Sequence, residues 1–338
     1  MEFISVICPI YNEEKHLKRC IDSLLRTTYP HNKLEIIFVD GMSTDASREI
    51  VNGYQKDYPF IQLIDNPEQI VPYALNYGIA VARGNIIFRI DAHAFFPDDY
   101  FAVLSEKLME LDADNVGGVC NTIPYDDTLI ARSIAIALSS PFGMGNSYFR
   151  IGSDSIRQVD TVPFGCFKRT IFEKIGLFDN DLVRNQDDEF NGRIIRNGGK
   201  IFLIPNVRID YVARKSLKNV YNMFYQYGLF KPLVNYKLKA VATVRQCIPP
   251  MFVGGIFLGV LASFISVYCF YLFLLGILAY LSVSCFFSLR AAVKEKMISL
   301  FGIQVVTYAV IHFAYGFGYW KGILNLFFRK RIVVKSNH

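Results

Sequence analysis

A long run without charged residues limits what this chain can fold into. From Met251 to Leu289 the sequence has no Asp, Glu, Lys or Arg for 39 residues, which is about twice the ~20 apolar residues that one membrane-spanning helix needs. We therefore expect two spanning helices joined by a tight turn. Arg245 precedes the run and Arg290 follows it, and basic flanks favour the cytoplasmic side of a membrane.

A third apolar segment, Met297 to Tyr319, leaves two alternatives open. It is followed by Lys321 and a basic tail, which a third span would carry to the far side of the membrane, against the preference of basic residues for the cytoplasm. The segment either spans in spite of this preference or is re-entrant or interfacial. Its Gly-rich stretch, His312 to Trp320, is compatible with a broken helix.

The charges divide the chain into two unlike parts. Residues 1–206 carry 20 Lys and Arg against 28 Asp and Glu, whereas residues 207–338 carry 16 against 2. The overall charge of +6 therefore conceals an acidic part and a basic, apolar part, which excludes a uniformly basic nucleic-acid-binding protein. A soluble domain attached to a membrane fits this distribution.

The segment between these parts, Val207 to Arg245, has eight basic residues and one acidic residue, with many Tyr and Phe. Cations and aromatic rings at this density are typical of helices that lie in the lipid headgroup layer, and the alternative is a solvated basic helix. We predict four regions: a catalytic domain in 1–206, interfacial helices in 207–247, a membrane region in 248–320 and a basic tail in 321–338.

Targeting and redox features indicate the cytosol. The first residues lack a basic stretch followed by a long apolar one, so no secretory signal is expected there. The seven cysteines form no CxxC pair, which favours buried thiols in a reducing compartment. We expect the first domain to stay in the cytosol.

The first 206 residues alternate between strands and helices. Apolar runs at 4–10, 35–39, 61–64 and 85–90 read as strands, and helical periodicity separates them. This alternation predicts an α/β domain with a mostly parallel, Rossmann-like sheet covered on both faces. Ligands of such sheets bind at the carboxyl ends of the strands, where the 9–13 turn, Asp40 and the Asp91–His93 segment are expected to collect.

Asp91 and His93 stand two residues apart between apolar residues. Buried charges need partners, and a metal ion would supply one, because carboxylate oxygen and neutral imidazole nitrogen both ligate first-row metals. A hydrogen-bonded Asp–His pair with a structural role is the alternative.

A second acidic cluster lies in residues 184–193. Local physics accounts for it, with Asn185 capping a helix and Glu189 pairing with Arg193. If this cluster faces the first one, a carboxylate here would be placed to take a proton from an incoming hydroxyl.

Five segments together resemble the GT-A fold family 2 glycosyltransferases, in particular the membrane-associated branch that builds bacterial exopolysaccharides and O-antigen. They are VICPIYNEE, IIFVDGMSTD, NYGIAVARGNIIFRIDAH, VDTVPFGCFKR and NQDDEFNGRIIRNGGKI, and they cover about residues 3–206. The resemblance implies an inverting hexosyltransferase-type enzyme with a nucleotide-sugar donor and a divalent metal. The implied donor-binding residues are Pro9, Tyr11, Glu13, Asp40, Asn76, Arg83 and Asp91, with Asp91 and His93 as metal ligands and Asp187 as the catalytic base.

Two departures from the family's pattern affect these assignments. His93 replaces the second Asp of the family's DxD motif, which favours Mn²⁺ over Mg²⁺ because manganese accepts nitrogen more readily. Gln186 stands where the family usually has Glu, which leaves Asp188 as the fallback for the base. Gly165 is assigned either to the acceptor side or to a simple turn.

The membrane part indicates a lipid-linked saccharide acceptor at the cytosolic face of the cytoplasmic membrane, with residues 118–160 contributing to acceptor specificity. Residues 226–229 lack the QxxRW motif of processive family members, so transfer of a single sugar in cell-surface polysaccharide synthesis is expected. The alternatives are a polyprenyl-phosphate sugar synthase and a nucleotide-sugar-binding scaffold without activity.

Overall fold

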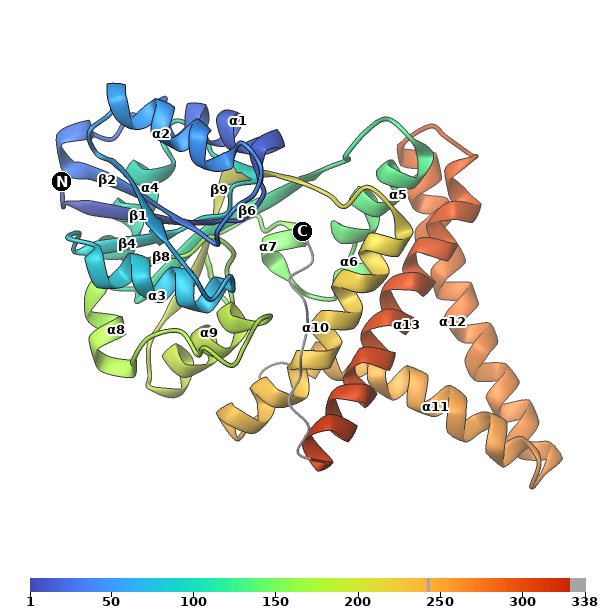
Figure 1. Cartoon of the computed structure of the whole chain (residues 1–338). Coiled ribbons are helices and arrows are strands. Elements are labelled where there is room, and N and C mark those ends of the chain that lie inside the picture. The colour runs from blue at the N-terminus through green and yellow to red at the C-terminus, as the bar shows by residue number, and fades with distance from the viewer. Residues whose placement is uncertain (242–243, 329–338) are drawn as a thin grey trace. The chain divides into compact units, whose positions relative to one another are not determined.

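The structure, a computed structural model, describes residues 1–241 and 244–328. It contains a nine-stranded sheet and a group of long helices (Figure 1). Two compact units make up the chain: the first holds Met1–Asn121 and Gly152–Tyr211, and the second holds Thr122–Ile151 and residues 212–328. The segment 122–151 therefore belongs with the helices that follow the sheet, although the sequence analysis assigned it to the catalytic domain.

Four strands of the first unit are parallel. The order is β3-β2-β1-β4, and Ile10 of β1 lies beside Asp40 of β2, which lies beside Asp65 of β3. The carboxyl ends of these strands therefore meet at one edge, as the sequence predicted. Their bounds are β1 Ile4–Ile10, β2 Leu34–Asp40, β3 Ile61–Asp65 and β4 Ile86–Arg89.

In the other half of the sheet, β4 pairs with β8 in the antiparallel sense, as do β8 with β6, β7 with β9 and β5 with β9. The prediction of a mostly parallel sheet holds only for the first four strands, since the later strands lack the regular strand–helix alternation. Their bounds are β5 Ala94–Phe95, β6 Asn115–Ile123, β7 Arg157–Gln158, β8 Cys166–Lys168 and β9 Ile201–Val212.

Helices cover both faces of the sheet. In Figure 1, α1 and α2 lie over one face, and α3, α8 and α9 lie over the other. The strands are buried because their side chains contact helices on either side. The bounds are α1 Glu14–Leu25, η1 His31–Lys33, α2 Ser47–Asp57, α3 Val71–Val81, α4 Tyr100–Glu110, α8 Arg169–Ile175 and α9 Gln186–Arg196.

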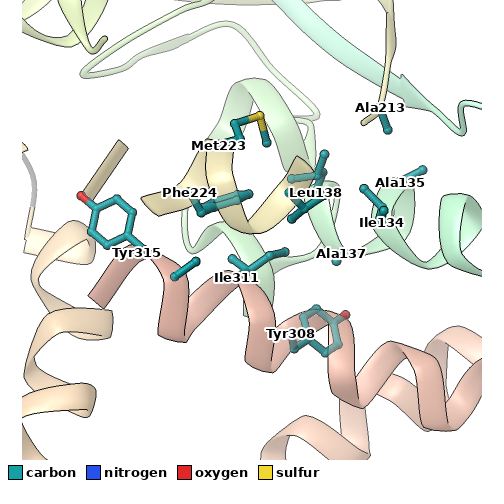
Figure 2. Close-up of a cluster of buried hydrophobic side chains, with 12 residues drawn as sticks. Ile134, Ala135, Ala137, Leu138, Ala213, Met223, Phe224, Tyr308, Ile311 and Tyr315 are labelled. Atoms are coloured by element: carbon teal, nitrogen blue, oxygen red, sulfur yellow. The ribbon is translucent and has the colours of Figure 1, made fainter. Parts of the chain in front are cut away.

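The second unit is helical and is organised around α13, which contacts α5, α6, α10, α11 and α12. Buried side chains from α5, α10 and α13, among them Ile134, Phe224 and Tyr308, form one apolar cluster (Figure 2). The bounds are α5 Leu129–Leu138, α6 Pro141–Met144, α7 Tyr148–Ile151, α10 Leu217–Leu238, η2 Val244–Cys247, α11 Ile248–Ser263, α12 Val267–Lys294 and α13 Leu300–Phe327.

Three helices are long and apolar enough to cross a membrane: the segment ending in α11, then α12 and α13. Residues 264–266 form the short connection expected inside the charge-free run. The His312–Trp320 stretch lies within one continuous helix, so the break that its glycines allowed is absent there. Only 11% of the most apolar window is buried in the first two helices. Of the basic tail, residues 329–338 lie outside the described residues.

The basic segment after residue 206 begins as a strand. β9 continues to Val212, and a single helix, α10, follows it, whereas the sequence predicted helices from 207 onward. Alternating buried residues in β9 explain the difference, since Val207, Ile209 and Tyr211 are buried while the residues between them are not. The location of α10 at a membrane surface stays a prediction.

α10 and α13 approach each other closely where glycines meet. A Cβ on Gly318 would lie 2.1 Å from the Tyr225 carbonyl oxygen, and a Cβ on Gly228 would lie 2.1 Å from that of Tyr315. Gly322, one turn after Gly318, has a similar clash with the Leu229 carbonyl oxygen. Small residues four apart let helix backbones pack tightly, which is a common arrangement among membrane helices.

We predict that Gly318→Ala destabilises the second unit by about 1–3 kcal/mol, because the added methyl group forces the two backbones apart. Gly302→Ala is the matched control on the same helix, since nothing lies within 4 Å of its added Cβ, and it should be neutral or slightly stabilising. Thermal unfolding of the two full-length variants in detergent measures the difference. Equal melting temperatures would show that the glycine contact does not hold α10 to α13.

Candidate active site

The residues predicted to form the site are mostly at the carboxyl edge of the parallel strands. The turn after β1 supplies Tyr11 and Glu13, β2 ends in Asp40, and β4 is followed by Asp91 and His93. Pro9 is part of β1 and pairs with Val39 of β2. The strand register, rather than any local motif, brings these segments together.

Arg89, the last residue of β4, links the two acidic clusters. Its Nη2 lies 2.9 Å from Asp91 Oδ1 and 3.6 Å from Asp187 Oδ2. The Arg89 side chain is only 10% exposed, and the two carboxylates are 24% and 34% exposed. The Asp91 and Asp187 carboxylates, 96 positions apart in the sequence, therefore face one guanidinium group. A buried cation with two anionic neighbours is well compensated, because either carboxylate alone can balance its single positive charge.

The surroundings of Asp187 alter its proton affinity. Removal of water from the carboxylate raises its pKa above the ordinary value of 3.8, the positive charge of Arg89 opposes this shift, and the negative charges of Asp91 and Asp188 add to it. A raised pKa makes the carboxylate a better proton acceptor. Perturbation by desolvation and by named charges is typical of functional carboxylates.

A buried polar network fixes α9, which begins at Gln186. Asn191 accepts a hydrogen bond of 2.8 Å from Asn115 Nδ2 and donates one of 2.8 Å to Thr161 Oγ1. Asn191 is 1% exposed and Asn115 is fully buried, so these bonds form away from competing water. Asn191 lies one helical turn after Asp187, and the network therefore determines where that carboxylate points.

Glu189 is engaged elsewhere. Its two carboxylate oxygens accept from Arg193 Nε at 2.7 Å and Arg193 Nη2 at 2.9 Å, the pairing that the sequence predicted. The same arginine donates to the carbonyls of Ile175 and Leu177. Asn185 occupies the position before the helix, with a left-handed φ of 61° and without the side-chain cap that the sequence predicted.

His93 contacts a carboxylate through one ring nitrogen. Its Nδ1 lies 3.2 Å from Glu13 Oε1, and its ring meets that of Tyr211 edge to face. A neutral imidazole that donates its Nδ1 proton to this carboxylate keeps its lone pair on Nε2. A carboxylate bound to the far nitrogen is the arrangement that orients histidines ligating metals in proteins.

The side chains of this site suit a metal ion that takes most of its ligands from elsewhere. Within residues 1–241 and 244–328 no three His, Cys, Asp or Glu side chains converge as a self-contained metal site. Mg²⁺ and similar ions are commonly held by one or two protein ligands together with substrate phosphates and water. Asp91 and an oriented His93 meet that requirement, with oxygen and nitrogen as donors.

The loops after β1 and β2 are joined by reciprocal hydrogen bonds. Asn12 accepts from the Thr44 backbone N–H at 2.8 Å, and Glu14 N donates to Asp45 Oδ2 at 3.1 Å. Glu14 Oε2 in turn accepts from Ala46 N at 3.2 Å. Each loop thus satisfies backbone N–H groups at the start of the helix that follows the other loop. Asn12 has a left-handed φ of 55°, and this backbone conformation directs its side chain toward the Thr44 backbone N–H.

Asp40 is fully buried and its carboxylate is already bound. Arg48 Nη1 lies 2.6 Å from Oδ2, and the Ser43 backbone N–H donates to both oxygens. The same arginine nitrogen lies 2.7 Å from Asp65 Oδ1. Asp40 therefore organises the loop after β2. The contact with a nucleotide base that the family resemblance implies would require Asp40 to lose its contact with Ser43 or Arg48.

Three predicted site residues are held in structural contacts. Arg83 lies at the amino ends of the strands, where its Nε donates to Glu35 Oε2 at 2.9 Å, so it is not brought to the carboxyl edge. The Asn76 side chain bonds both backbone polar groups of Phe178. Gly165 packs inside, because a Cβ there would lie 2.5 Å from the Phe167 ring. The strand and turn patterns of the sequence near these residues do not predict that Glu35, Phe178 and Phe167 contact them.

Arg89 is the residue of this site that sequence reasoning missed. It reads as an ordinary polar residue in the segment FRIDAH. A signal was present, since a charged residue two positions before Asp91 lies on the same face of an extended chain.

A comparison with protein families gives this site its chemical context. The family model described as glycosyl transferase family 2 matches residues 5–176, which include β1, β2, β4 and the Asp91–His93 segment. The chain belongs to glycosyltransferase family 2.

Two relatives extend the family assignment along the chain. A dolichyl N-acetyl-α-D-glucosaminyl phosphate 3-β-D-2,3-diacetamido-2,3-dideoxy-β-D-glucuronosyltransferase from Methanococcus voltae is 31% identical over 242 residues, covering 69% of this chain and 74% of the relative. Succinoglycan biosynthesis protein ExoA from Rhizobium meliloti is 25% identical over 330 residues, covering 97% and 96%. The second similarity includes the apolar helices.

A solved structure supports the fold. The mannosyltransferase PcManGT from Pyrobaculum calidifontis, in complex with GDP-Man and Mn²⁺, superposes with a TM-score of 0.59 at 20% sequence identity, covering 92% of this chain and 87% of that chain. This family 2 glycosyltransferase therefore has the GT-A fold that the sequence motifs implied, followed by C-terminal helices.

The raised pKa of Asp187 predicts a pH-dependent effect on stability. A carboxyl group whose pKa is higher in the folded than in the unfolded protein costs stability once the pH exceeds both values. Asp187→Asn removes this cost, so its melting temperature should equal or exceed that of the wild type at neutral pH, and this advantage should shrink as the pH falls toward 4.

Thermal unfolding of the full-length protein between acidic and neutral pH tests this prediction. Asp154→Asn, at an exposed position of the same unit, is the control for loss of one surface charge. A clear loss of stability in Asp187→Asn at neutral pH would mean that attraction to Arg89 outweighs desolvation.

Proposed function

We propose that this family 2 glycosyltransferase transfers a single sugar from a nucleotide-diphosphate sugar to a lipid-linked saccharide, with inversion at the anomeric carbon and with the help of a divalent metal. One observation carries the proposal: Arg89 draws Asp91, a donor-side carboxylate, and Asp187, a proton acceptor, to the same guanidinium. A reaction that joins two substrates needs a donor-binding group and a base at one place.

The proposed reaction has one displacement step. The Asp187 carboxylate takes the proton of the acceptor hydroxyl as that oxygen bonds to the anomeric carbon. The bond from this carbon to the diphosphate oxygen breaks on the opposite side, so the configuration inverts and the nucleoside diphosphate leaves with the electron pair. Arg89 holds Asp187 and Asp91 in position, and Glu13 orients His93.

Asp91 and His93 would hold the metal, with Mn²⁺ preferred and Mg²⁺ as the alternative. When bound, a divalent ion supplies Lewis acidity that stabilises the charge developing on the leaving diphosphate. The P. calidifontis mannosyltransferase was solved in complex with GDP-Man and Mn²⁺, which supports a metal and a nucleotide sugar for this fold. Pro9, Tyr11, Glu13 and Asp40 remain the proposed donor side, with the base contact of Asp40 dependent on its present partners.

The acceptor proposal rests on the second unit and on the relatives. The name of the M. voltae relative describes transfer to a dolichyl-phosphate-linked sugar, and that of the R. meliloti relative describes succinoglycan biosynthesis. Three helices are apolar enough to cross a membrane. We propose a multi-pass protein of the cytoplasmic membrane whose catalytic unit meets lipid-linked acceptors at the cytosolic face, where anchoring raises their effective concentration. Residues 207–247 would lie at the headgroup layer.

Replacing the proposed base tests the assignment. We expect Asp187→Asn to lower kcat by about 10²–10⁴-fold while the KM for the nucleotide sugar changes little, because the carboxylate acts on the acceptor hydroxyl. Asp188→Asn is the matched control one position along α9 and should keep most of its turnover. Full turnover by Asp187→Asn would reject it as the base, and a selective loss in Asp188→Asn would move the role there.

The same assay separates the alternatives. Purified wild-type protein is supplied with a nucleotide sugar, Mn²⁺ and either a polyprenyl phosphate or a lipid-linked glycan. Transfer to the glycan supports the proposal, and transfer to the bare lipid phosphate supports a polyprenyl-phosphate sugar synthase. Absence of both transfer and metal-dependent hydrolysis indicates a binding scaffold.

The Glu13–His93 contact predicts how metal affinity responds to mutation. Loss of the partner of a metal-ligating histidine typically lowers affinity by about 10–100-fold, so Glu13→Gln should weaken Mn²⁺ binding measured by electron paramagnetic resonance with nucleoside diphosphate present. His93→Asp should move the preference from Mn²⁺ toward Mg²⁺. Unchanged Mn²⁺ affinity in both variants would exclude His93 as a ligand.

A further inference from the structure

The first unit holds a polar pocket that the proposed reaction does not use. Its volume is about 230 Å³, equivalent to roughly eight waters at their liquid volume. α1 supplies Arg19, Arg26 is the residue that follows α1, β5 supplies Phe95, and β9 supplies Arg208 and Asp210. Three cations therefore line a small cavity together with one carboxylate.

Each arginine of this pocket is held differently. The Arg19 guanidinium carbon lies 3.8 Å from the centroid of the Phe95 ring, and a guanidinium over an aromatic ring keeps its N–H groups available at its edges. Arg26 pairs with Asp98 at 3.3 Å. Within the described part of the chain, neither Arg19 nor Arg208 forms an ion pair, so neither is in direct contact with a protein carboxylate.

The fold, rather than chance surface composition, assembles these groups. β5 and β9 pair in the antiparallel sense, with Phe95 beside Asp210, and Arg208 lies two residues before Asp210 and thus on the same side of the strand. Asp210 accepts a hydrogen bond of 2.7 Å from Asn121. Bringing like charges together costs free energy unless an anion lies between them.

The chemistry of the lining identifies the anion. Arginine presents a planar fork of donors that matches phosphate oxygens. The cavity is smaller than the roughly 300–1,000 Å³ of pockets that enclose drug-sized ligands, so it suits a phosphate or diphosphate group and not a whole nucleotide sugar. We propose that the pocket formed by Arg19, Arg26 and Arg208 binds a phosphate group.

Two sources present this chemistry: a soluble phosphate compound, or the phosphate of a lipid. The pocket shares β5 and β9 with the segment that carries His93: Phe95 follows His93 by two residues, and Tyr211, which contacts the His93 ring, is the residue after Asp210 on the opposite face of β9. An occupant here would therefore stabilise the segment that carries His93. Binding is measurable without turnover, so the test is independent of the proposed reaction.

The experiment uses full-length protein in neutral detergent without divalent metal and measures binding of inorganic pyrophosphate by calorimetry. Loss of one charge-assisted hydrogen bond of about 1.5–3 kcal/mol corresponds to roughly 10–100-fold in affinity. We expect a loss of this size in Arg19→Gln and in Arg208→Gln. Lys18→Gln, one position before Arg19 and exposed on the same helix, is the matched control and should bind like the wild type.

The source is identified with the protein in nanodiscs of phosphatidylcholine, with or without phosphatidic acid. Competition between phosphatidic acid and pyrophosphate supports a lipid phosphate, and unchanged pyrophosphate binding supports a soluble one. The proposal is overturned by absence of binding to both probes, by an equal loss in Lys18→Gln, or by loss of binding in His93→Asn, which would place pyrophosphate at the donor site. Thermal unfolding of each variant verifies that it is folded.

Discussion

The charge balance around Arg89 is the interaction on which the site depends. A guanidinium that is only 10% exposed at the end of β4 needs anionic neighbours, and Asp91 and Asp187, which lie 96 positions apart in the sequence, both face it. The cation keeps two carboxylates together that would otherwise repel each other. Arg89 also limits how far desolvation raises the pKa of Asp187. One guanidinium therefore influences both the position and the pKa of this carboxylate.

Residues of α9 other than Asp187 make the contacts that hold this helix in place. Glu189 is committed to Arg193, and Asn191 is committed to Asn115 and Thr161. These contacts fix the helix from its second turn onward and leave the first turn facing Arg89. Local interactions within the helix, such as the pairing of Glu189 with Arg193, explain why acidic residues occur here. These contacts still leave the Asp187 carboxylate facing Arg89, because its neighbours on α9 hold the helix in place.

The sequence predicts those features that depend on nearby residues. Apolar runs predicted β1, β2 and β4, and the absence of charged residues predicted α11 and α12, because burial and hydropathy leave a pattern in neighbouring residues. Contacts between residues distant in the sequence leave no such pattern and were not predicted. Asn76 matched the motif but bonds Phe178, and Arg83 matched it but bonds Glu35. The role of Arg89 was missed for the same reason, because its two carboxylates are contributed by different elements. The antiparallel half of the sheet, with short strands such as β5, also lacked a periodic signal.

The two units differ in how they bury apolar side chains, and the uneven charge of the chain follows this difference. The sheet of the first unit is buried between helices, so its polar residues are free to form ionic networks at strand ends. In the second unit, α11 and α12 expose most of their apolar side chains, whereas 44% of the most apolar window of α13 is buried against other helices. Such a density of exposed Phe and Leu is typical of helices that contact lipid. Contact between α10 and α13 combines an apolar cluster that includes Phe224 and Tyr308 with close backbone packing at glycines. The glycines fix how the two helices fit together, because a side chain at these positions would collide with the facing backbone.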